Sequence, residues 1–273
     1  MNTVSDPSAL PYETKREFFS TLALQNKWAM KLHRLSGQTQ RGEKPPRYDG
    51  DKDQRWGDVT QHCLVEAAAS RVLSDTLGLS PKDKEKFFKA ALVHDAHKRP
   101  EIEAINAAKA SLGADASPED FDRINDIAYD QSKQFLLDNG VDPEVVRLTG
   151  TVAHTSVDQF VELDEHNTMR LRDDVPLLDM AMHWLDDATK QTQVVTIPER
   201  MDYLVENQDR YPYVEAGRAK WGGRTYFEAQ REAALLVQDK LEAVAGIEHG
   251  TLPQVVNNGL AASILQFAQT TEL

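Results

Sequence analysis

The chain has 273 residues and a formal net charge of −13, with 27% charged and 40% hydrophobic residues. This composition is ordinary for a globular protein and excludes collagen-like, disulfide-scaffold and wholly disordered chains. The length allows one large domain or two small ones. No basic run stands out among the 31 Lys and Arg residues, against 44 Asp and Glu residues, which argues against bulk nucleic acid as a partner.

A single cysteine, Cys63, excludes intrachain disulfides and cysteine-rich zinc sites. No segment approaches the roughly 20 consecutive apolar residues of a membrane span, and residues 1–20 contain no long apolar stretch. We therefore expect a cytoplasmic protein with no membrane partner.

Turn signals predict several helix starts. Ser80-Pro81, Ser117-Pro118 and Asp142-Pro143 each place a capping side chain before a proline that suits the first helical position. Acidic residues follow in the first turn, where the helix dipole favours them. Apolar residues recur with the helical period between these signals, and the best strand-like run is 194–197. The sequence predicts an all-α fold.

We expect about nine helices and one more helix near the end of the sequence. They lie near 13–36, 57–78, 81–97, 100–113, 118–139, 143–163, 175–190, 198–209 and 224–245, with the last near 252–268. They suggest an N-terminal helical arm and loop (1–50), a helical core (51–210) and a C-terminal helical extension packed on the core (211–273). The helix at 13–36 either covers the core or pairs with a second copy in a homo-oligomer.

The informative histidines are those in apolar helical runs, His62, His94 and His154. His94 closes an apolar run and is followed at once by Asp95, with Lys98 in the next turn. An imidazole and a carboxylate side by side at a helix end can face one cavity, and this ligand pair suits Mn, Fe, Co, Ni or Zn and less typically Mg. Three other histidines are expected at the surface, namely His33, His166 and His249.

These residues, in this order, resemble the HD-domain superfamily of metal-dependent phosphohydrolases. The superfamily's pattern is a His, a His-Asp pair one helix later, and an Asp several helices further on. His62 matches the first His and His94-Asp95 the pair, while 183–190 resembles the helix that carries the last Asp. The resemblance covers about 55–205 and implies an HD-type helical bundle that holds one divalent metal ion.

The resemblance also implies the roles of individual residues. The metal ligands would be His62, His94, Asp95 and Asp186, with Asp187 and Asp179 as competing assignments for the last. The catalytic residues would be Asp95, Lys98 and His154, and the substrate-binding residues Lys98, Arg99 and Arg200. The implied reaction is hydrolysis of a small phosphate ester by metal-activated water, with a nucleotide or deoxynucleotide as the substrate class most frequent in the superfamily.

Two alternatives stay open. Mixed-valent di-iron oxygenases on the same fold add two histidines; His154 could fill one place, but Gln131 stands where the other would fall. The other alternative is a non-catalytic helical binding module stabilised by its metal. The segment around Tyr211 and Tyr213 either closes over a phosphorylated ligand or is a surface turn, and Glu66 and Glu101 are weaker candidates for a general base.

Overall fold

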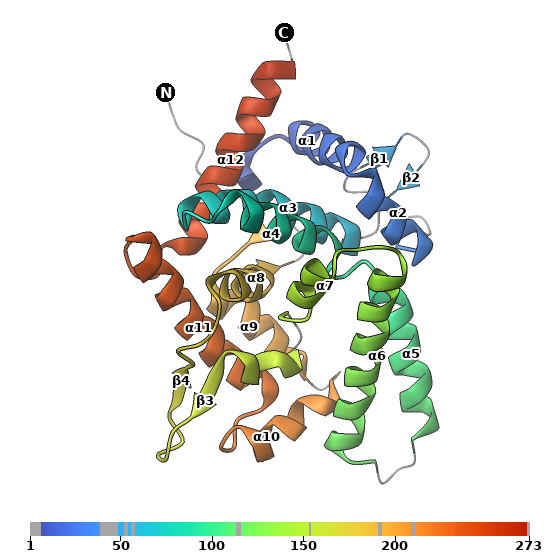
Figure 1. Cartoon of the computed structure of the whole chain (residues 1–273), viewed down its shortest axis with the longest axis vertical. Helices are drawn as coiled ribbons and strands as arrows, with labels where there is room; N and C mark the ends of the chain where they lie inside the picture. Colours follow the sequence, from blue (N-terminus) through green and yellow to red (C-terminus); the bar gives the residue numbers. More distant parts are fainter. Residues whose placement is uncertain are drawn as a thin grey trace.

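The computed structural model describes residues 7–38, 49–51, 54–55, 58–112, 116–152, 154–190, 193–208 and 211–271. In these ranges the chain forms twelve α-helices and three two-stranded antiparallel sheets, which confirms the predicted all-α fold (Figure 1). The α-helices are α1 (Tyr12–Gln25), α2 (Lys27–Leu35), α3 (Asp58–Thr76), α4 (Pro81–Val93), α5 (Lys98–Ser111), α6 (Pro118–Asp138), α7 (Pro143–Thr149), α8 (Leu177–Asp187), α9 (Ile197–Glu206), α10 (Gly217–Lys220), α11 (Tyr226–Ala245) and α12 (Leu252–Thr271). The strands are β1 (Asp49–Asp51), β2 (Gln54–Arg55), β3 (Val161–Leu163), β4 (Met169–Leu171), β5 (Thr189–Lys190) and β6 (Gln193–Val194). Short 3-10 helices are η1 (Pro7–Ala9), η2 (His154–Gln159) and η4 (Pro212–Ala216).

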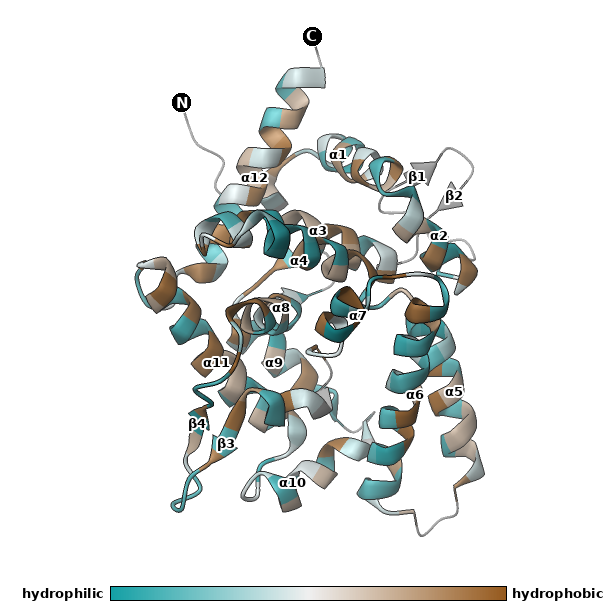
Figure 2. Cartoon of the chain, viewed as in Figure 1, coloured by the Kyte–Doolittle hydropathy of each residue, from teal (hydrophilic) through white to brown (hydrophobic). Residues whose placement is uncertain are grey.

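The core is built on α3, α4 and α8. α3 and α4 pack against each other, α8 contacts both, and α1 and α12 lie against α3. α5 and α6 stand side by side at one edge, where α6 is mostly teal in Figure 2 because it is a largely hydrophilic helix. None of the helices in the described ranges has the length and apolar character needed to cross a membrane.

The predicted helix at 13–36 is two helices. The side chain of Asn26 donates to the Leu22 carbonyl (2.8 Å) at the junction, so the chain ends α1 there and restarts as α2. The expectation that His33 lies at the surface is wrong, since its side chain in α2 is wholly buried. Its Nε2 lies 2.9 Å from the Leu92 carbonyl and its Nδ1 3.1 Å from Thr60 Oγ1, which joins the arm to α4 and α3.

The predicted helix at 143–163 is much shorter than expected. α7 ends at Thr149, and the chain continues through η2 into a hairpin of β3 and β4. The turn is favoured locally: Asp164 Oδ1 accepts from the amides of His166 (2.8 Å) and Thr168 (2.9 Å), and Asn167 adopts a positive φ of 59°. The strand-like run at 194–197 is only partly a strand. β6 ends at Val194, and α9 begins at Ile197 because Thr196 caps it through a capping box with Glu199.

The predicted helix starts after Ser80, Ser117 and Asp142 are confirmed. Ser80 Oγ accepts from the Asp83 amide (3.2 Å), Ser117 forms a full capping box with Asp120, and Asp142 accepts from an amide of the first turn. These contacts satisfy amides that have no partner within the helix. The starts were predictable because each contact is local.

The C-terminal part of the chain packs through a close backbone approach at Gly217. A Cβ atom added at this position would lie 2.8 Å from the carbonyl carbon of Thr225 and would overlap the backbone nitrogen of Tyr226. Because the neighbour is backbone, it cannot rotate away. Gly217 therefore sets the spacing between α10 and the start of α11, and through η4 the position of Tyr213.

We predict that Gly217→Ala lowers the free energy of unfolding by about 1–3 kcal/mol, the usual cost of overpacking. Ala219→Ser is the matched control, since Ala219 is exposed in the same short helix and should change stability by less than about 0.5 kcal/mol. Urea denaturation followed by circular dichroism measures both. Equal stability of the two variants would show that the backbone separates at this contact without cost.

Candidate metal centre

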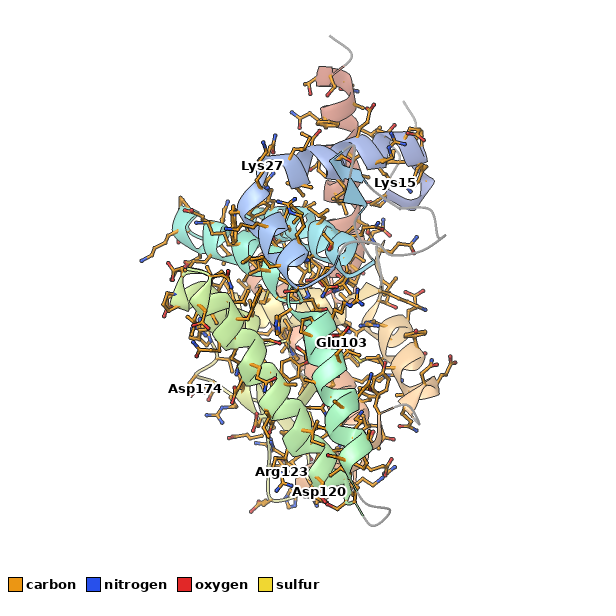
Figure 3. All side chains as sticks on the ribbon, turned by 90° about the vertical axis from the view of Figure 1, so that its right-hand side faces the viewer. Lys15, Lys27, Glu103, Asp120, Arg123 and Asp174 are labelled. Carbon is orange, nitrogen blue, oxygen red and sulfur yellow. The ribbon has the colours of Figure 1, made fainter. Side chains whose placement is uncertain are left out.

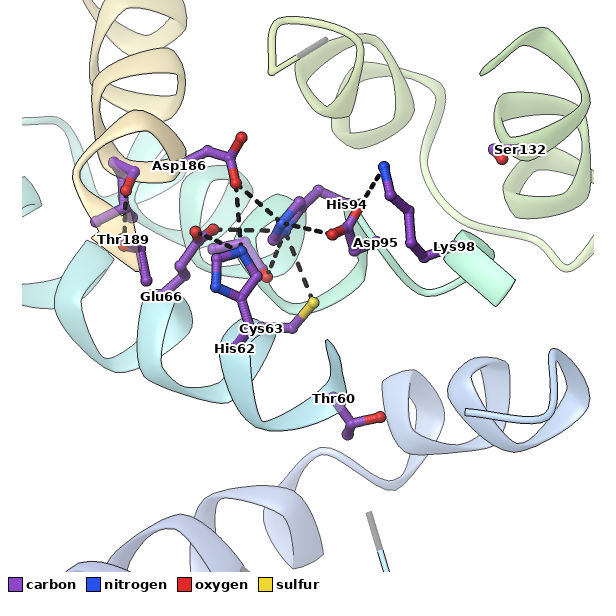
Figure 4. Close-up of polar contacts among 12 residues, drawn as sticks. Thr60, His62, Cys63, Glu66, His94, Asp95, Lys98, Ser132, Asp186 and Thr189 are labelled. Atoms are coloured by element: carbon purple, nitrogen blue, oxygen red, sulfur yellow. Dashed lines mark hydrogen bonds and ion pairs between the residues drawn. The ribbon is translucent and has the colours of Figure 1, made fainter. Parts of the chain in front are cut away.

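Three helices bring a cluster of ligand-type side chains together. His62 comes from α3, His94 caps the C-terminus of α4, and Asp186 comes from the last turn of α8. Asp186 Oδ1 lies 3.3 Å from His62 Nε2 and 3.6 Å from His94 Nε2 (Figure 4). Ligand atoms that are each about 2.1 Å from one metal ion are about 3.0–4.2 Å apart, so these separations suit a shared cation.

Asp95 stands at the edge of this cluster. Its Oδ2 is 3.9 Å from His94 Nε2, within the range expected for two ligands of one ion. Burial raises the pKa of Asp95, but the neighbouring charges of Lys98 and His94 outweigh burial and lower it below the ordinary value. The carboxylate is therefore ionised and faces the cluster.

Glu66 was missed as a ligand. It lies one turn after His62 on α3, so the two side chains share a helix face. Its Oε1 is 3.0 Å from His62 Nε2 and its Oε2 is 3.5 Å from His94 Nδ1. With His62, His94 and Asp186 it completes a group whose ligand atoms all lie within 4.8 Å of one another and could hold a metal ion. The four-residue spacing from His62 was the available signal.

The donor set fits a cation by its hydrogen bonding. His94 Nδ1 lies 3.1 Å from the Ala91 carbonyl, which can only accept, so in the neutral imidazole Nδ1 carries the proton and Nε2 has a lone pair for a cation. That Nε2 is buried without a hydrogen-bond partner among the described residues, and both oxygens of Glu66 are buried against the two imidazoles. Buried groups of this kind are costly unless an ion satisfies them.

The carboxylates also draw positive charge onto the imidazoles. Burial lowers the pKa of His62, but Glu66 and Asp186 outweigh burial and raise it well above the ordinary value. Burial also lowers the pKa of His94, but its interactions with Cys63 and then Glu66 outweigh burial and raise the pKa well above the ordinary value. The cluster thus requires positive charge, which a proton or a metal ion can supply at the same nitrogens.

A cavity of about 390 Å³ opens beside the cluster, with His62, Asp95 and Asp186 in its wall. Lys98 and Arg200 also line it. The Nε of Arg200 is buried and makes no hydrogen bond within the described ranges. Arg200 thus adds a second positive charge to the cavity wall, beside that of Lys98.

Lys98 is held in the cavity by a network along α5 and α6. Its Nζ lies 2.9 Å from Glu101 Oε1 and 3.6 Å from Asp95 Oδ1, and Ser132 Oγ donates to Glu101 Oε2 (3.0 Å). Burial lowers the pKa of Lys98, but Asp95, Tyr129 and Glu101 outweigh burial and raise it well above the ordinary value. The ammonium stays charged next to the cluster, and Glu101 is engaged rather than free to act as a base.

The start of α5 is fixed by the N-terminal arm. Arg99 Nη1 donates to the Gly37 carbonyl (3.1 Å), and its Nε donates to Glu103 (3.0 Å). With its amide oxygen facing the helix, Gln38 accepts from the backbone amides of Lys98 (3.1 Å) and Arg99 (2.8 Å). Arg99 thus points toward the arm and does not line the cavity, so the structure offers no support for its predicted substrate contact.

The competing assignments for the last ligand lie elsewhere. Asp179 forms a two-pronged ion pair with Arg147 (2.6 and 2.9 Å), and Asp187 accepts from Gln230. Asp187 Oδ2 also lies 3.2 Å from His183 Nε2, behind the cluster. Asp186 is therefore the one of the three that joins the group.

Other predicted residues have different outcomes. His154 begins η2, but its side chain lies outside the described residues. Gln131 is exposed on α6, whereas Tyr129 on the same helix lines the cavity. Tyr211 and Tyr213 line the cavity as well, which the sequence left open. The basic residues after them form surface ion pairs instead, Arg218 with Glu215, Lys220 with Asp158 and Arg224 with Glu232.

Comparisons with protein-family models, curated proteins and solved structures find no match to this chain. What the structure establishes is the helical fold and a buried to half-buried group of His62, Glu66, His94 and Asp186 that could bind a metal ion.

We predict that Glu66→Gln weakens Mn²⁺ binding by about tenfold or more, because the amide keeps the shape but removes the buried negative charge. Glu103→Gln is the matched control, since Glu103 lies exposed on the outer face of α5 (Figure 3). Competition with a chromogenic chelator measures both affinities. Wild-type affinity in Glu66→Gln would exclude the carboxylate from the metal centre.

Proposed function

We propose that the protein is a metal-dependent phosphohydrolase of the HD type that cleaves a small phosphate ester, with a nucleotide or deoxynucleotide as the favoured substrate class. The observation that carries the proposal is the cluster of His62, Glu66, His94 and Asp186 beside a cavity whose wall includes His62, Asp186 and the neighbouring Asp95, with His94 Nε2 buried and without a hydrogen bond in the described part of the chain. Two cationic side chains, Lys98 and Arg200, line the cavity next to the cluster and are suited to bind a phosphate.

The charges around the cavity suit a phosphorylated ligand. The chain as a whole carries −13, yet the cavity wall combines three carboxylates with three cations. They are Asp95, Glu101 and Asp186 against Lys98, Lys109 and Arg200. A bound divalent cation would make this wall net positive, and such a site favours a phosphate dianion over neutral ligands.

The residues support in-line hydrolysis at phosphorus. A divalent cation held by the cluster would polarise a phosphoryl oxygen and lower the pKa of a bound water. Asp95, ionised at the edge of the cluster, would orient the attacking water. Lys98 and Arg200 would neutralise charge on the equatorial oxygens, where preorganised donors stabilise the transition state most.

Tyr129 is a candidate hydrogen-bond donor to the leaving group. Its side chain lines the cavity, and Lys98 Nζ lies 5.5 Å from its ring centroid. Burial raises the pKa of Tyr129, so the phenol stays protonated and serves as a hydrogen-bond donor. We place it against the substrate oxygen that departs or against a phosphoryl oxygen.

We predict that His94→Ala abolishes phosphate release from the active members of a nucleotide and sugar-phosphate panel. The protein is stripped with chelator and refilled separately with Mn, Fe, Co, Ni, Zn or Mg. Turnover should return in the wild type and fall by about 100-fold or more in the variant, because several kcal/mol of transition-state stabilisation is lost. His166→Ala is the control, since His166 is 77% exposed in the β3–β4 turn.

Silence of the wild type across the panel with every metal would refute the hydrolase proposal for these substrates. The metal content and oxygen consumption of the same sample would then separate the two alternatives. Two iron ions with oxygen-dependent turnover would identify an oxygenase. Unfolding on chelation without any turnover would identify a non-catalytic module.

We predict that Arg200→Met lowers kcat/KM by about 10–100-fold, because a charge-assisted contact to the phosphoryl group is lost. Mn²⁺ affinity measured in parallel separates this effect from damage to the metal centre. Arg231→Met is the control, since Arg231 pairs with Asp202 on the surface. An unchanged kcat/KM would show that Arg200 serves only to balance the charge of Asp186.

A further inference from the structure

The cavity extends well beyond the metal cluster, along one face of α5. Its wall contains Lys98, Glu101, Ile102, Ile105, Asn106 and Lys109. Spacings of three and four residues place these side chains in one stripe. Eleven residues of α-helix separate Lys98 from Lys109, a distance of about 16 Å along the axis. We call this elongated half of the cavity the α5 trough.

The middle of the α5 trough is apolar. Ile102 on the helix and Tyr203 on the opposite wall leave 46% and 38% of their surface exposed, and both line the cavity. Large apolar side chains that remain exposed inside a cavity mark a surface for an apolar or flat ligand body. Leu204 and Ile105 continue this surface.

The far end of the α5 trough is polar and carries a cation. Lys109 is half-buried there, and the amide side chains of Asn106 and Asn125 also line the cavity. Within the described ranges Lys109 forms no ion pair with a carboxylate. Its Nζ lies 6.0 Å from the ring centroids of both Phe121 and Tyr213, the outer limit for a cation–π contact. Burial lowers the pKa of Lys109, as expected of an ammonium without a compensating charge.

An anion is the natural partner for such a group. Most half-buried lysines in the described part of the chain are paired with a carboxylate, as Lys98 is with Glu101 and Asp95. Lys109 instead lines a cavity whose other end, at Lys98, binds the phosphate in the proposed function. The two ammonium groups stand on the same helix stripe and point into the same space.

We propose that the far end of the α5 trough binds a second anionic group, so that the substrate is an elongated phosphate ester with an apolar middle and a second phosphate or carboxylate at its opposite end. The inference rests on the proposed function for the end at Lys98, where the scissile phosphate lies. It makes Lys109 a specificity-determining residue: it selects doubly anionic substrates over compact monoesters.

Non-hydrolysable phosphonates test the spacing directly. The full chain loaded with Mn²⁺ is titrated calorimetrically with α,ω-alkane bisphosphonates from ethane to dodecane, and with alkyl monophosphonates of the same lengths. We expect an optimum at an intermediate or long chain, where the bisphosphonate binds about tenfold or more tighter than its matched monophosphonate. Phosphonocarboxylates of the optimal length show whether a carboxylate also satisfies Lys109.

Variants assign the gain to Lys109. Lys109→Met keeps the apolar stem and should reduce the ratio of the two affinities to about one. Lys133→Met is the matched control and should retain the ratio, because Lys133 pairs with Asp130 on the surface of α6. The chain-length profile of the wild type tests the inference on its own, even where a variant is unstable.

The outcomes separate the two proposals. A wild type that binds monophosphonates but shows no gain from the second phosphonate overturns the inference and leaves the hydrolase proposal standing. A gain that survives Lys109→Met also overturns it. Failure of every phosphonate to bind overturns both proposals, because the phosphate site at Lys98 would then be absent as well.

Discussion

The buried carboxylate of Glu66 is the constraint on which the packing of the helices around the candidate site depends. Glu66 has no exposed surface, and its two oxygens lie against the imidazoles of His62 (3.0 Å) and His94 (3.5 Å), so positive charge inside the core has to balance the carboxylate. The two imidazoles that flank it come from different helices, α3 and α4. The packing of those helices is therefore tied to electrostatics as well as to apolar contact. α8 closes the arrangement from the other side with Asp186.

The same arrangement places the cavity. The turn after His94 leads directly into α5, so the helix that begins at the cluster also forms the cavity wall. α8 is buried on nearly every side, and Trp184 ties it to α11 through Gln238 (3.0 Å). Asp186 thus stands on a rigid support. The 3-10 helix η4 and the residue before it add Tyr213 and Tyr211 to the cavity wall, so the candidate site also draws on the C-terminal part of the chain.

Local chemistry was predictable from the sequence, and tertiary effects were not. The caps at Ser80 and Ser117 follow from contacts three residues apart. The order of His62, His94-Asp95 and Asp186 identified residues that the fold brings together, because each is marked by its type and its helical setting. The burial of His33 depends on Leu92 and Thr60, far away in sequence, and no local pattern reports it. The place of Lys109 is equally non-local, since it needs the cavity to be known.

The contacts at Gly37 and Gln38 have a thermodynamic consequence. Both residues belong to the N-terminal arm, yet they hold the first turn of the helix that carries Lys98. Docking of the arm on the core and ordering of the first turn of α5 are therefore coupled. By thermodynamic linkage, each process favours the other to the same extent. If Lys98 binds a ligand, as proposed, binding would favour docking of the arm on the core, and a partner that competes for the arm would weaken ligand binding. The arm would then modulate ligand affinity from outside the cavity, through contacts between side chains and backbone groups at Gly37 and Gln38.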